Sequence, residues 1–330
     1  MSSPTEHMIT DSIYIGIDNG NGRIKALSSK GLTTKIKSLI YYLSNEQEIT
    51  DSGNDSVFVE YISGPRTELW GQRFVVGQQA YQFSPNGVFS PSDDREGKSK
   101  FALELSLAAI SQSITMDYTN VAISLSVHDL GAFSDLQNQV NGEHTVKLNN
   151  QLRKINIDLK VVKIEGLGAY ASLLLAKKCT KAAQTILIDI GFGTIIVSVY
   201  SNGAWKQVIP FPDMGVKSLY QRISSNLEVR KQLKRTGDIQ LIQRAIERGD
   251  FIYGVNRISQ FSLANIYDQE LYPWVKKSLV TVLGKIDSYL DGSEFMFAIG
   301  GGSKLPKVSS WLEKKGFEVV VDSEIIVSAQ

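Results

Sequence analysis

Apolar positions in the first half of the chain follow the two-residue period of strands more often than the longer period of helices. Short apolar runs bounded by glycine, proline, asparagine or aspartate are typical of strands. They predict strands at Ile13–Ile17, Ile24–Leu27, Ser38–Leu43, Ser56–Ile62, Phe74–Val76, Val121–Val127 and, around the turn Asn149–Asn150, over Val146–Lys163. One amphipathic helix is expected at Phe101–Ile114, after a polar stretch, Pro91–Lys100, that has the character of a loop.

The second half of the chain is dominated by helical periodicity. Apolar residues recur at helical spacing in four segments, which predicts helices at Gly166–Lys178, Ser218–Ala245, Val255–Tyr267 and Leu271–Leu290. A hairpin is expected over Thr185–Tyr200, and Phe295–Ile299 is expected to be a short strand. Strands and helices thus share the chain, which indicates an α/β class.

A weak internal repeat is the strongest organising signal. Ile17–Gly22 and Ile188–Gly193 both have the pattern I-D-x-G-x-G, and each copy lies between two predicted strands. A repeated turn makes most sense where both copies touch one ligand, so the repeat indicates two related domains.

Each D-x-G-x-G turn has a structural and a functional interpretation. As a plain tight turn, it uses glycine for positive φ and aspartate to cap its own backbone. As a ligand site, its glycines let backbone N–H groups approach phosphate oxygens while the aspartate holds a hydrated Mg²⁺. Lys25 favours the second interpretation, since alternation on the outgoing strand places it with Arg23 and opposite Ile24, within reach of the turn.

Two further strand ends carry candidate chemistry. Gly300–Gly302 follows a strand and precedes a helix, so it is either a flexible linker or a place where backbone approaches a ligand; it lacks the dinucleotide fingerprint. Glu165 is presented where a strand passes into a helix. It is either a helix-entry residue or a carboxylate that orients a water for attack on phosphorus.

Charge, cysteine and histidine content exclude several classes of protein. Among 330 residues, 35 Lys+Arg nearly balance 34 Asp+Glu, so no global field favours nucleic acid or anionic membrane, and 42% hydrophobic content excludes a disordered chain. The one cysteine, Cys179, excludes a disulfide framework and a cysteine-based zinc site, and it is expected to fill space near a helix end rather than to act as a nucleophile. The three histidines, His7, His128 and His144, share no metal-ligand spacing, and we assign them no chemistry.

Two surface features bear on location and partners. The N-terminus lacks the order of a signal peptide and no segment approaches the ~20 apolar residues of a membrane span, so we expect a cytoplasmic protein without a membrane partner. The basic cluster Arg230, Lys231, Lys234 and Arg235 is expected on one helix at i, i+4 spacing. It is either a solvated helix face or a partner-binding surface.

Five motifs, in this order along nearly the whole chain, resemble those of the actin superfamily. They are a first phosphate loop at Asp18–Lys25, a connecting helix at Glu165–Ala171, a second phosphate loop at Asp189–Thr194, a second connecting segment at Asp213–Val216 and an adenosine motif at Ile299–Gly302. Val76–Ala80, and a glutamate at position 165 where actin carries glutamine, resemble the ParM plasmid-segregation and archaeal actin branch. Two departures, the missing proline before Glu165 and the pair Ile195–Ile196 after the second loop, bear on hydrolysis rate more than on binding.

The resemblance implies an α/β, actin-like (ribonuclease-H-like) fold, with two similar domains around a nucleotide cleft and a five-stranded sheet in each. Domain I is expected at residues 11–164, with the C-terminal segment 304–330 returning to it. Domain II is expected at residues 165–303, with a helical insertion over about 218–290.

Residue roles follow from the resemblance only at matched positions. It implies that Mg²⁺ and ATP are bound, with Asp18 and Asp189 holding the metal through water. Glu165 and Asp189 are implied to be catalytic, Glu165 by positioning the attacking water. The implied nucleotide-binding residues are Asp18, Asn19, Gly20, Asn21, Gly22, Lys25, Gly191, Phe192, Gly193, Thr194, Gly215, Gly300, Gly301 and Gly302.

The function implied is an ATPase that polymerises into dynamic filaments for plasmid or DNA segregation. Its partners would be further copies of itself and a DNA-bound adaptor protein, without direct nucleic-acid binding. Two alternatives stay open from the sequence: a sugar or small-acid kinase of the same superfamily, which would need a further aspartate as general base, and a nucleotide-binding regulatory module without turnover.

Overall fold

The computed structural model describes residues 12–44, 46–47, 53, 55–85, 87–93, 97–127, 130–254 and 260–320. The chain divides into two compact units, one ending at Leu167 and the other beginning at Gly168. Each has its own hydrophobic core. The predictions at His7 and His128 and over residues 255–259 lie outside the described residues.

The first unit is built on one large sheet with strand order β3-β2-β1-β7-β9-β8-β5-β6-β4. The strands are β1 (Ile13–Asn19), β2 (Arg23–Ser28), β3 (Thr33–Lys37), β4 (Ile40–Tyr42), β5 (Ser56–Ser63), β6 (Arg73–Gly77), β7 (Tyr118–Val127), β8 (Gly142–Leu148) and β9 (Gln151–Ile164). The expectation of a five-stranded sheet was wrong for this unit, because β8, β5, β6 and β4 extend the first five strands to nine. The strand expected at Ser38–Leu43 is shorter in the structure and consists of β4. Ser38 lies outside the strands, because it follows the end of β3, a strand that was not predicted.

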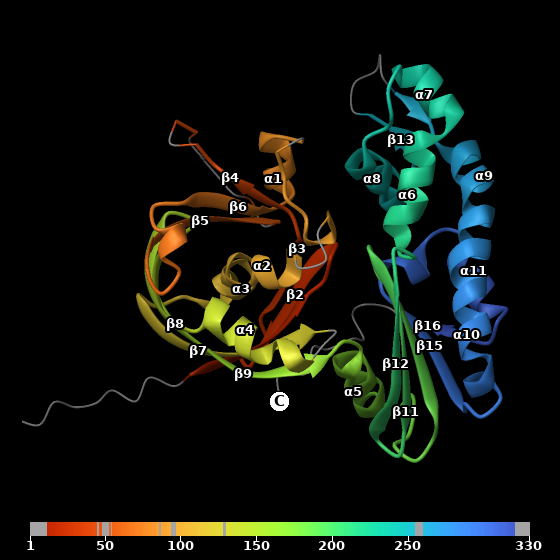
Figure 1. The fold of residues 1–330 in the computed structure, drawn as a ribbon, viewed down its shortest axis with the longest axis horizontal. Helices are drawn as coiled ribbons and strands as arrows, with labels where there is room; N and C mark the ends of the chain where they lie inside the picture. The colour runs from red at the N-terminus through yellow and green to blue at the C-terminus, as the bar shows by residue number, and fades with distance from the viewer. Residues whose placement is uncertain are drawn as a thin grey trace, which may run out of the picture. The chain divides into compact units, whose positions relative to one another are not determined.

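The sheet curls around a central helix, α3 (Ala102–Ile110), as Figure 1 shows. Every residue of α3 is buried, including Glu104 and Ser106. The expectation of an amphipathic helix with an exposed polar face was therefore wrong, because the curled sheet surrounds the helix. Shorter helices are α1 (Gln78–Phe83), α2 (Gly97–Lys100) and α4 (Phe133–Val140). The prediction of a loop at Pro91–Lys100 was wrong in part, because this segment contains α2 and a 3₁₀ turn. The helix predicted after it ends at Ile110 rather than at Ile114.

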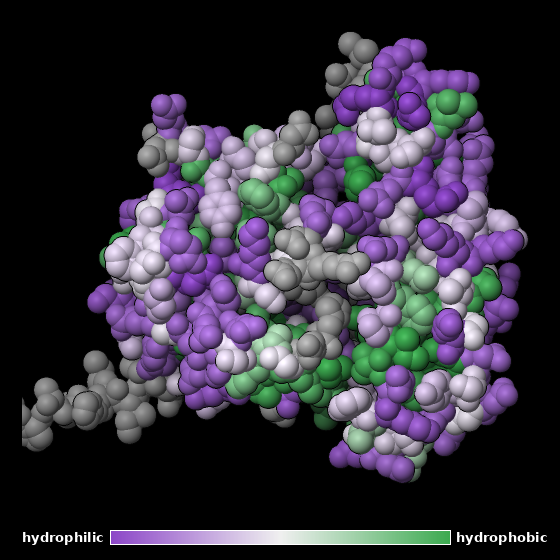
Figure 2. All heavy atoms as spheres, viewed as in Figure 1, coloured by the Kyte–Doolittle hydropathy of each residue, from purple (hydrophilic) through white to green (hydrophobic). Residues whose placement is uncertain are grey.

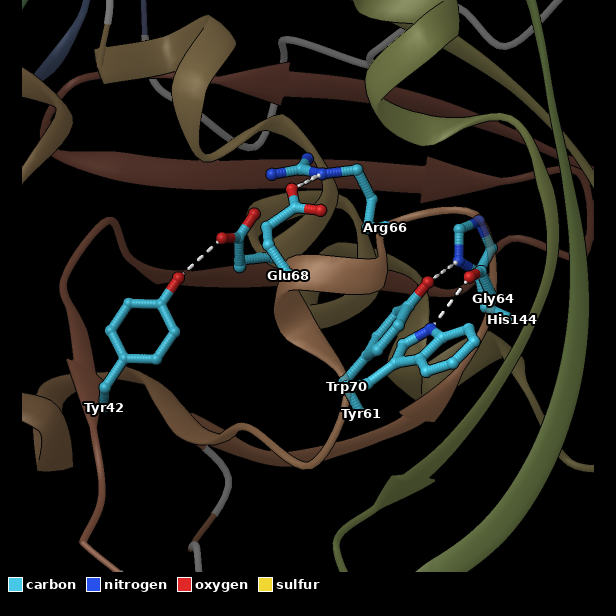
Figure 3. A network of polar contacts seen from close by, with 8 residues as sticks. Tyr42, Tyr61, Gly64, Arg66, Glu68, Trp70 and His144 are labelled. Atoms are coloured by element: carbon cyan, nitrogen blue, oxygen red, sulfur yellow. Dashed lines mark hydrogen bonds and ion pairs between the residues drawn. The ribbon is translucent and has the colours of Figure 1, made fainter.

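Figure 3 shows polar contacts in this unit, some made by side chains buried in the core and others by exposed ones such as Glu68 and Trp70. Glu104 on α3 is buried and accepts a hydrogen bond from the Tyr42 hydroxyl at 2.6 Å. His144, to which the sequence assigned no chemistry, lies fully buried in β8. Its Nε2 lies 3.0 Å from the carbonyl of Val140, which only accepts, so Nε2 carries the proton and Nδ1 accepts from the Tyr61 hydroxyl at 2.8 Å.

The second unit has a five-stranded sheet of order β12-β11-β10-β15-β16. Its strands are β10 (Thr185–Ile190), β11 (Thr194–Ser201), β12 (Ala204–Pro212), β15 (Phe295–Ile299) and β16 (Glu318–Val319); β13 (Ile252–Tyr253) pairs separately with β14 (Phe261–Ser262). The C-terminal segment was expected to return to the first domain. Its described part instead stays in the second unit, because β16 pairs in parallel with β15 and α11 (Val308–Glu313) packs beside it.

Helices of the second unit are α5 (Leu167–Leu175), α6 (Val216–Ser225), α7 (Leu227–Leu233), α8 (Ile239–Arg248), α9 (Ala264–Val275) and α10 (Thr281–Leu290). The single helix expected at Ser218–Ala245 was wrong: Asn226 and Asp238 each cap a new helix with their side chains, which divides the segment into three. The helix expected at Val255–Tyr267 was also wrong in part. Phe261–Ser262 forms the strand β14, and α9 begins only at Ala264. A π-helical turn, Lys276–Val280, joins α9 to α10.

No helix within the described part of the chain is long and apolar enough to cross a membrane. Cys179, which follows α5, is a buried free thiol.

Candidate functional site

The first candidate turn closes the hairpin of β1 and β2. Asp18 pairs with Lys25 across the two strands, and Asn19 pairs with Ile24. Direct cross-strand partners project from the same face of a sheet, so Asp18 and Lys25 lie together, and Arg23 shares their face as predicted. Asn19 projects from the opposite, core face; it is 5% exposed, and its Oδ1 has no hydrogen-bond partner among the described residues.

Ser38 fixes the back of this turn. Its hydroxyl donates to the carbonyl of Gly20 at 2.5 Å, and its backbone N–H donates to the carbonyl of Gly22 at 3.2 Å. In a trans peptide the C=O of one residue and the N–H of the next point in opposite directions. The amide of Asn21 therefore points away from Ser38, which leaves it on the open side of the turn. Gly20 also leaves no room for a side chain, because a β-carbon there would lie 2.6 Å from the carbonyl oxygen of Arg23.

The neighbouring strand β3 adds two lysines that the sequence analysis missed. Lys35 pairs with Lys25, and Lys37 pairs with Arg23. Four cationic side chains thus occupy one face of β2 and β3 beside Asp18. The alternating segment Thr33–Lys37 carried this signal, since its lysines share one period-two face.

Glu165 lies at the same edge of the sheet as the first turn. Strands β1, β7 and β9 are parallel neighbours. The C-terminal ends of β1 at Asn19 and of β9 at Ile164 therefore lie at the same end of the sheet. Glu165 follows β9 at the strand-to-helix junction, as predicted, and is 8% exposed. The carboxyl ends of parallel strands are where α/β sheets bind ligands.

The second candidate turn repeats the first hairpin in the same register. Asp189 pairs with Ile196 across β10 and β11, as Asp18 pairs with Lys25. In the second hairpin, Ile196 thus stands where the first hairpin has Lys25, and Ile196 is only 4% exposed. The two turns share geometry, but only the first has a cation opposite its aspartate.

The start of α6 holds the second turn from behind. The amide of Val216 donates to the carbonyl of Gly191 at 3.1 Å, and the amide of Lys217 donates to that of Phe192 at 2.8 Å. By the same trans-peptide geometry, the successive amides of Phe192 and Gly193 point away from α6. Two adjacent N–H groups on one side of a turn form a pocket of positive potential suited to an anion.

Gly215 and Phe192 serve as the support of this turn. A β-carbon on Gly215 would lie 2.7 Å from the carbonyl oxygen of Gly191, so only glycine allows α6 this close. The ring of Phe192 packs on Tyr220 of α6, with ring centroids 6.2 Å apart. The structure thus places Gly215 behind the turn rather than on its open side.

Gly300–Gly302 lies beside the second turn, because β15 is the parallel neighbour of β10. Gly300 has φ of +83°, and a β-carbon there would collide with Oδ1 of Asp189. Gly302 is equally confined, with the carbonyl of Ile190 at 2.9 Å from its missing β-carbon. Gly301 between them has open space around it and is exposed.

The candidate residues therefore form one cluster in each unit. Asp18, the turn Gly20–Gly22, Lys25 and Glu165 share an edge of the first sheet, and Asp189, the turn Gly191–Thr194 and Gly300–Gly302 share an edge of the second. Both clusters offer outward amides beside a carboxylate, which fits a phosphate ester better than a bare metal. No group of three or more His, Cys, Asp or Glu side chains that could hold a metal ion occurs among the residues described.

Comparison with known proteins agrees with this arrangement. Residues 16–168 match the family of actin-like proteins, N-terminal domain. No curated protein sequence matches the chain. Among solved structures, the archaeal actin homologue Ta0583 aligns with a TM-score of 0.75 and 18% identity, covering 96% of both chains.

Two bacterial ParM structures align over a similar span. The 15-stranded ParM filament from Clostridium botulinum gives a TM-score of 0.69 at 16% identity, covering 94% of this chain and 95% of that one. ParM from Bacillus thuringiensis with AMPPNP gives 0.63 at 17% identity, covering 93% of each. Residues 16–168 in the first unit thus match the family of actin-like N-terminal domains, and the chain as a whole has the actin-like fold.

Proposed function

We propose that this protein binds ATP and hydrolyses it, using the two turns to hold the phosphates. The observation that carries the proposal is the second turn, whose amides of Phe192 and Gly193 are directed to the open side by α6. The first turn adds the amide of Asn21 and the cation of Lys25 beside Asp18. Gly301, exposed between two confined glycines, would let the backbone approach the adenosine part of the ligand.

Asp18 and Asp189 would hold Mg²⁺ through water, since that ion keeps several waters and takes one or two carboxylates plus phosphate oxygens. When bound, the ion would neutralise charge on the phosphates. The cluster geometry suits this role, because each unit offers its turn's aspartate next to outward amides.

Glu165 would position the attacking water. The carboxylate is nearly buried at the edge of the sheet where the first turn lies, so it is held in place rather than solvated. Positioning of this kind acts mainly in the transition state, so Glu165 contributes to turnover more than to binding.

We further propose that ATP drives the chain into filaments, in the cytoplasm, for segregation of plasmid or other DNA through an adaptor protein. Support comes from likeness to ParM from Clostridium botulinum, which was solved as a filament, and from solved complexes of the archaeal homologue with ADP and of a Bacillus ParM with AMPPNP. Head-to-tail contacts that do not close generate helical filaments.

Phosphate release from Mg-ATP without any acceptor, with sedimentation of the same samples, tests the proposal. We expect release that rises with protein concentration, and pelleting above a critical concentration that is lower with ATP than with ADP. Release only after a sugar or small acid is added would instead make the protein a kinase. Binding without release would make it a regulatory module, and no binding would overturn the proposal.

A further inference from the structure

A groove runs between α6 and α9 in the second unit, where the two helices lie side by side (Figure 1). Its volume is about 590 Å³, within the range of ligand-binding pockets. On one side it is lined by α6 from Ser218 to Ser225 and by the start of α7 at Leu227. On the other side it is lined by α9 from Glu270 to Trp274 and by Lys277 in the π-helical turn that follows. None of these residues belongs to the phosphate-binding turns.

The groove offers more hydrogen-bond donors than acceptors. Its one carboxylate, Glu270, is already bound by the Arg222 guanidinium at 2.7 Å and by the Asn226 amide at 2.9 Å. The other polar groups on the lining include Gln221 and the ammonium of Lys277, both exposed. An occupant of this groove is therefore expected to be rich in acceptors and negatively charged.

A basic rim continues the groove at its α7 end. The cluster Arg230, Lys231, Lys234 and Arg235 was expected on one helix, but α7 ends at Leu233, and Lys234 follows in the left-handed region with φ of 58°. All four side chains are exposed, and the surface over α7 is mostly hydrophilic in Figure 2. Leu227, at the junction of rim and groove, is 63% exposed and offers an apolar contact.

We propose that the groove and its rim bind an acidic, extended segment of a partner protein. The lining of α6 runs from Ser218 to Ser225 and rises by about 10 Å at ~1.5 Å per residue, which matches about three residues of extended chain. Carboxylates of the segment would face Lys277 and Arg222 inside the groove, and further acidic residues would meet the α7 rim. An apolar side chain would rest on Leu227.

The floor of the groove connects it to the second turn. The indole N–H of Trp274 lies 3.0 Å from the Ser218 hydroxyl and 3.3 Å from the carbonyl of Gly215, and Ser218 also donates to that carbonyl at 2.7 Å. Gly215 is the residue that backs the turn Gly191–Gly193. A bound segment that moves α9 against α6 would therefore alter nucleotide affinity; this second part rests on the proposed function.

Binding of the segment is tested without nucleotide, by fluorescence anisotropy of a labelled octapeptide of glutamates around one leucine. The variant K231Q/K277Q should bind about tenfold more weakly than wild type, and the control K285Q/K314Q, with the same loss of charge elsewhere in the unit, within about twofold. Three results would overturn the proposal: no binding to wild type, equal losses in both variants, or stronger binding of a single-stranded oligonucleotide than of the peptide.

Coupling is tested by ADP affinity with and without saturating peptide. We expect the peptide to change ADP affinity at least about threefold, and ADP to change peptide affinity by the same factor, because linkage is reciprocal. The variant Trp274→Phe keeps an aromatic side chain but loses the indole N–H, so it should bind peptide while losing the coupling. Peptide binding that leaves ADP affinity unchanged in wild type would overturn the coupling, and absence of ADP binding altogether would instead count against the proposed function.

Discussion

The carboxylate of Asp189 lies directly against Gly300, at the ends of two neighbouring parallel strands. A side chain at position 300 would occupy the space that Oδ1 of Asp189 fills. Gly300, in the adenosine motif, thus sets the position of Asp189 in the second turn. Two segments more than a hundred residues apart in the sequence act as one piece of the candidate site.

Gly300→Ala should destabilise the second unit and displace Asp189. The substitution forces a β-carbon onto a residue with φ of +83° and into the Asp189 carboxylate, so we expect a loss of roughly 1–3 kcal/mol in the free energy of unfolding. The matched control is Gly301→Ala, which meets nothing within 4 Å and should change stability by less than about 0.5 kcal/mol. Denaturant unfolding measures both, and equal losses would contradict this account of Gly300.

Asp189→Asn should lower ATP turnover at least about 100-fold, about 2.7 kcal/mol in barrier height, while leaving the fold intact. The amide keeps the shape of the side chain beside Gly300 but removes the charge proposed to hold Mg²⁺. Steady-state phosphate release, with circular dichroism as the control for folding, measures the effect. Turnover within about threefold of wild type would remove Asp189 from the site.

Glu165→Ala should slow hydrolysis by about tenfold or more while nucleotide affinity stays within about threefold, because water positioning acts in the transition state. Glu165→Gln, which keeps the size of the side chain, separates loss of packing from loss of the carboxylate. Single-turnover phosphate release and equilibrium binding are the two measurements. If both variants release phosphate at the wild-type rate, Glu165 is a helix-entry residue only.

Glu104→Gln should stabilise the first unit increasingly as pH rises. Burial raises the pKa of the Glu104 carboxyl, although the hydrogen bond from Tyr42 acts in the opposite direction. The protonated form is thus favoured in the folded state, and its contribution to stability is present below the unfolded pKa of about 4.3 and lost as pH rises through the folded pKa. Glutamine keeps an acceptor for Tyr42 and has no proton to lose.

Urea unfolding of wild type and Glu104→Gln at several pH values between 4 and 8 measures this difference. Glu313→Gln, an exposed glutamate on α11, is the control and should show no comparable trend. A stability difference between Glu104→Gln and wild type that stays constant with pH would contradict the assignment of a raised pKa.

The two hairpins show what the sequence can and cannot reveal. The repeat I-D-x-G-x-G predicted both turns, and simple alternation placed Lys25 on the same face as Arg23. The pairing of Asp18 with Lys25 is known only from the structure. The supports of the turns were not predictable, because Ser38 and the start of α6 reach them through long-range packing that no local pattern encodes. Lys35 was missed for a simpler reason: its strand was not recognised.

The predicted helix boundaries were wrong where side-chain capping divides a segment whose apolar period is continuous. The apolar period over Ser218–Ala245 continues through Asn226 and Asp238, yet both side chains accept hydrogen bonds from the next helix and restart it. The C-terminal segment was placed from the family pattern rather than from its residues. Its parallel pairing with β15 depends on tertiary packing, because Phe317 and Val320 on either side of β16 are buried in the second unit.

The central claim is that each of the two turns binds nucleotide phosphate, and calorimetric titration with Mg-AMPPNP tests it most directly. The account predicts saturable binding of one nucleotide per chain to wild type. It also predicts at least about tenfold weaker binding, about 1.4 kcal/mol, after Lys25→Gln in the first turn and, separately, after Gly193→Ala in the second. Lys285→Gln, on the exposed side of α10, should bind as wild type does. Absence of binding to the folded wild-type protein, or binding that neither turn variant weakens, would contradict the account.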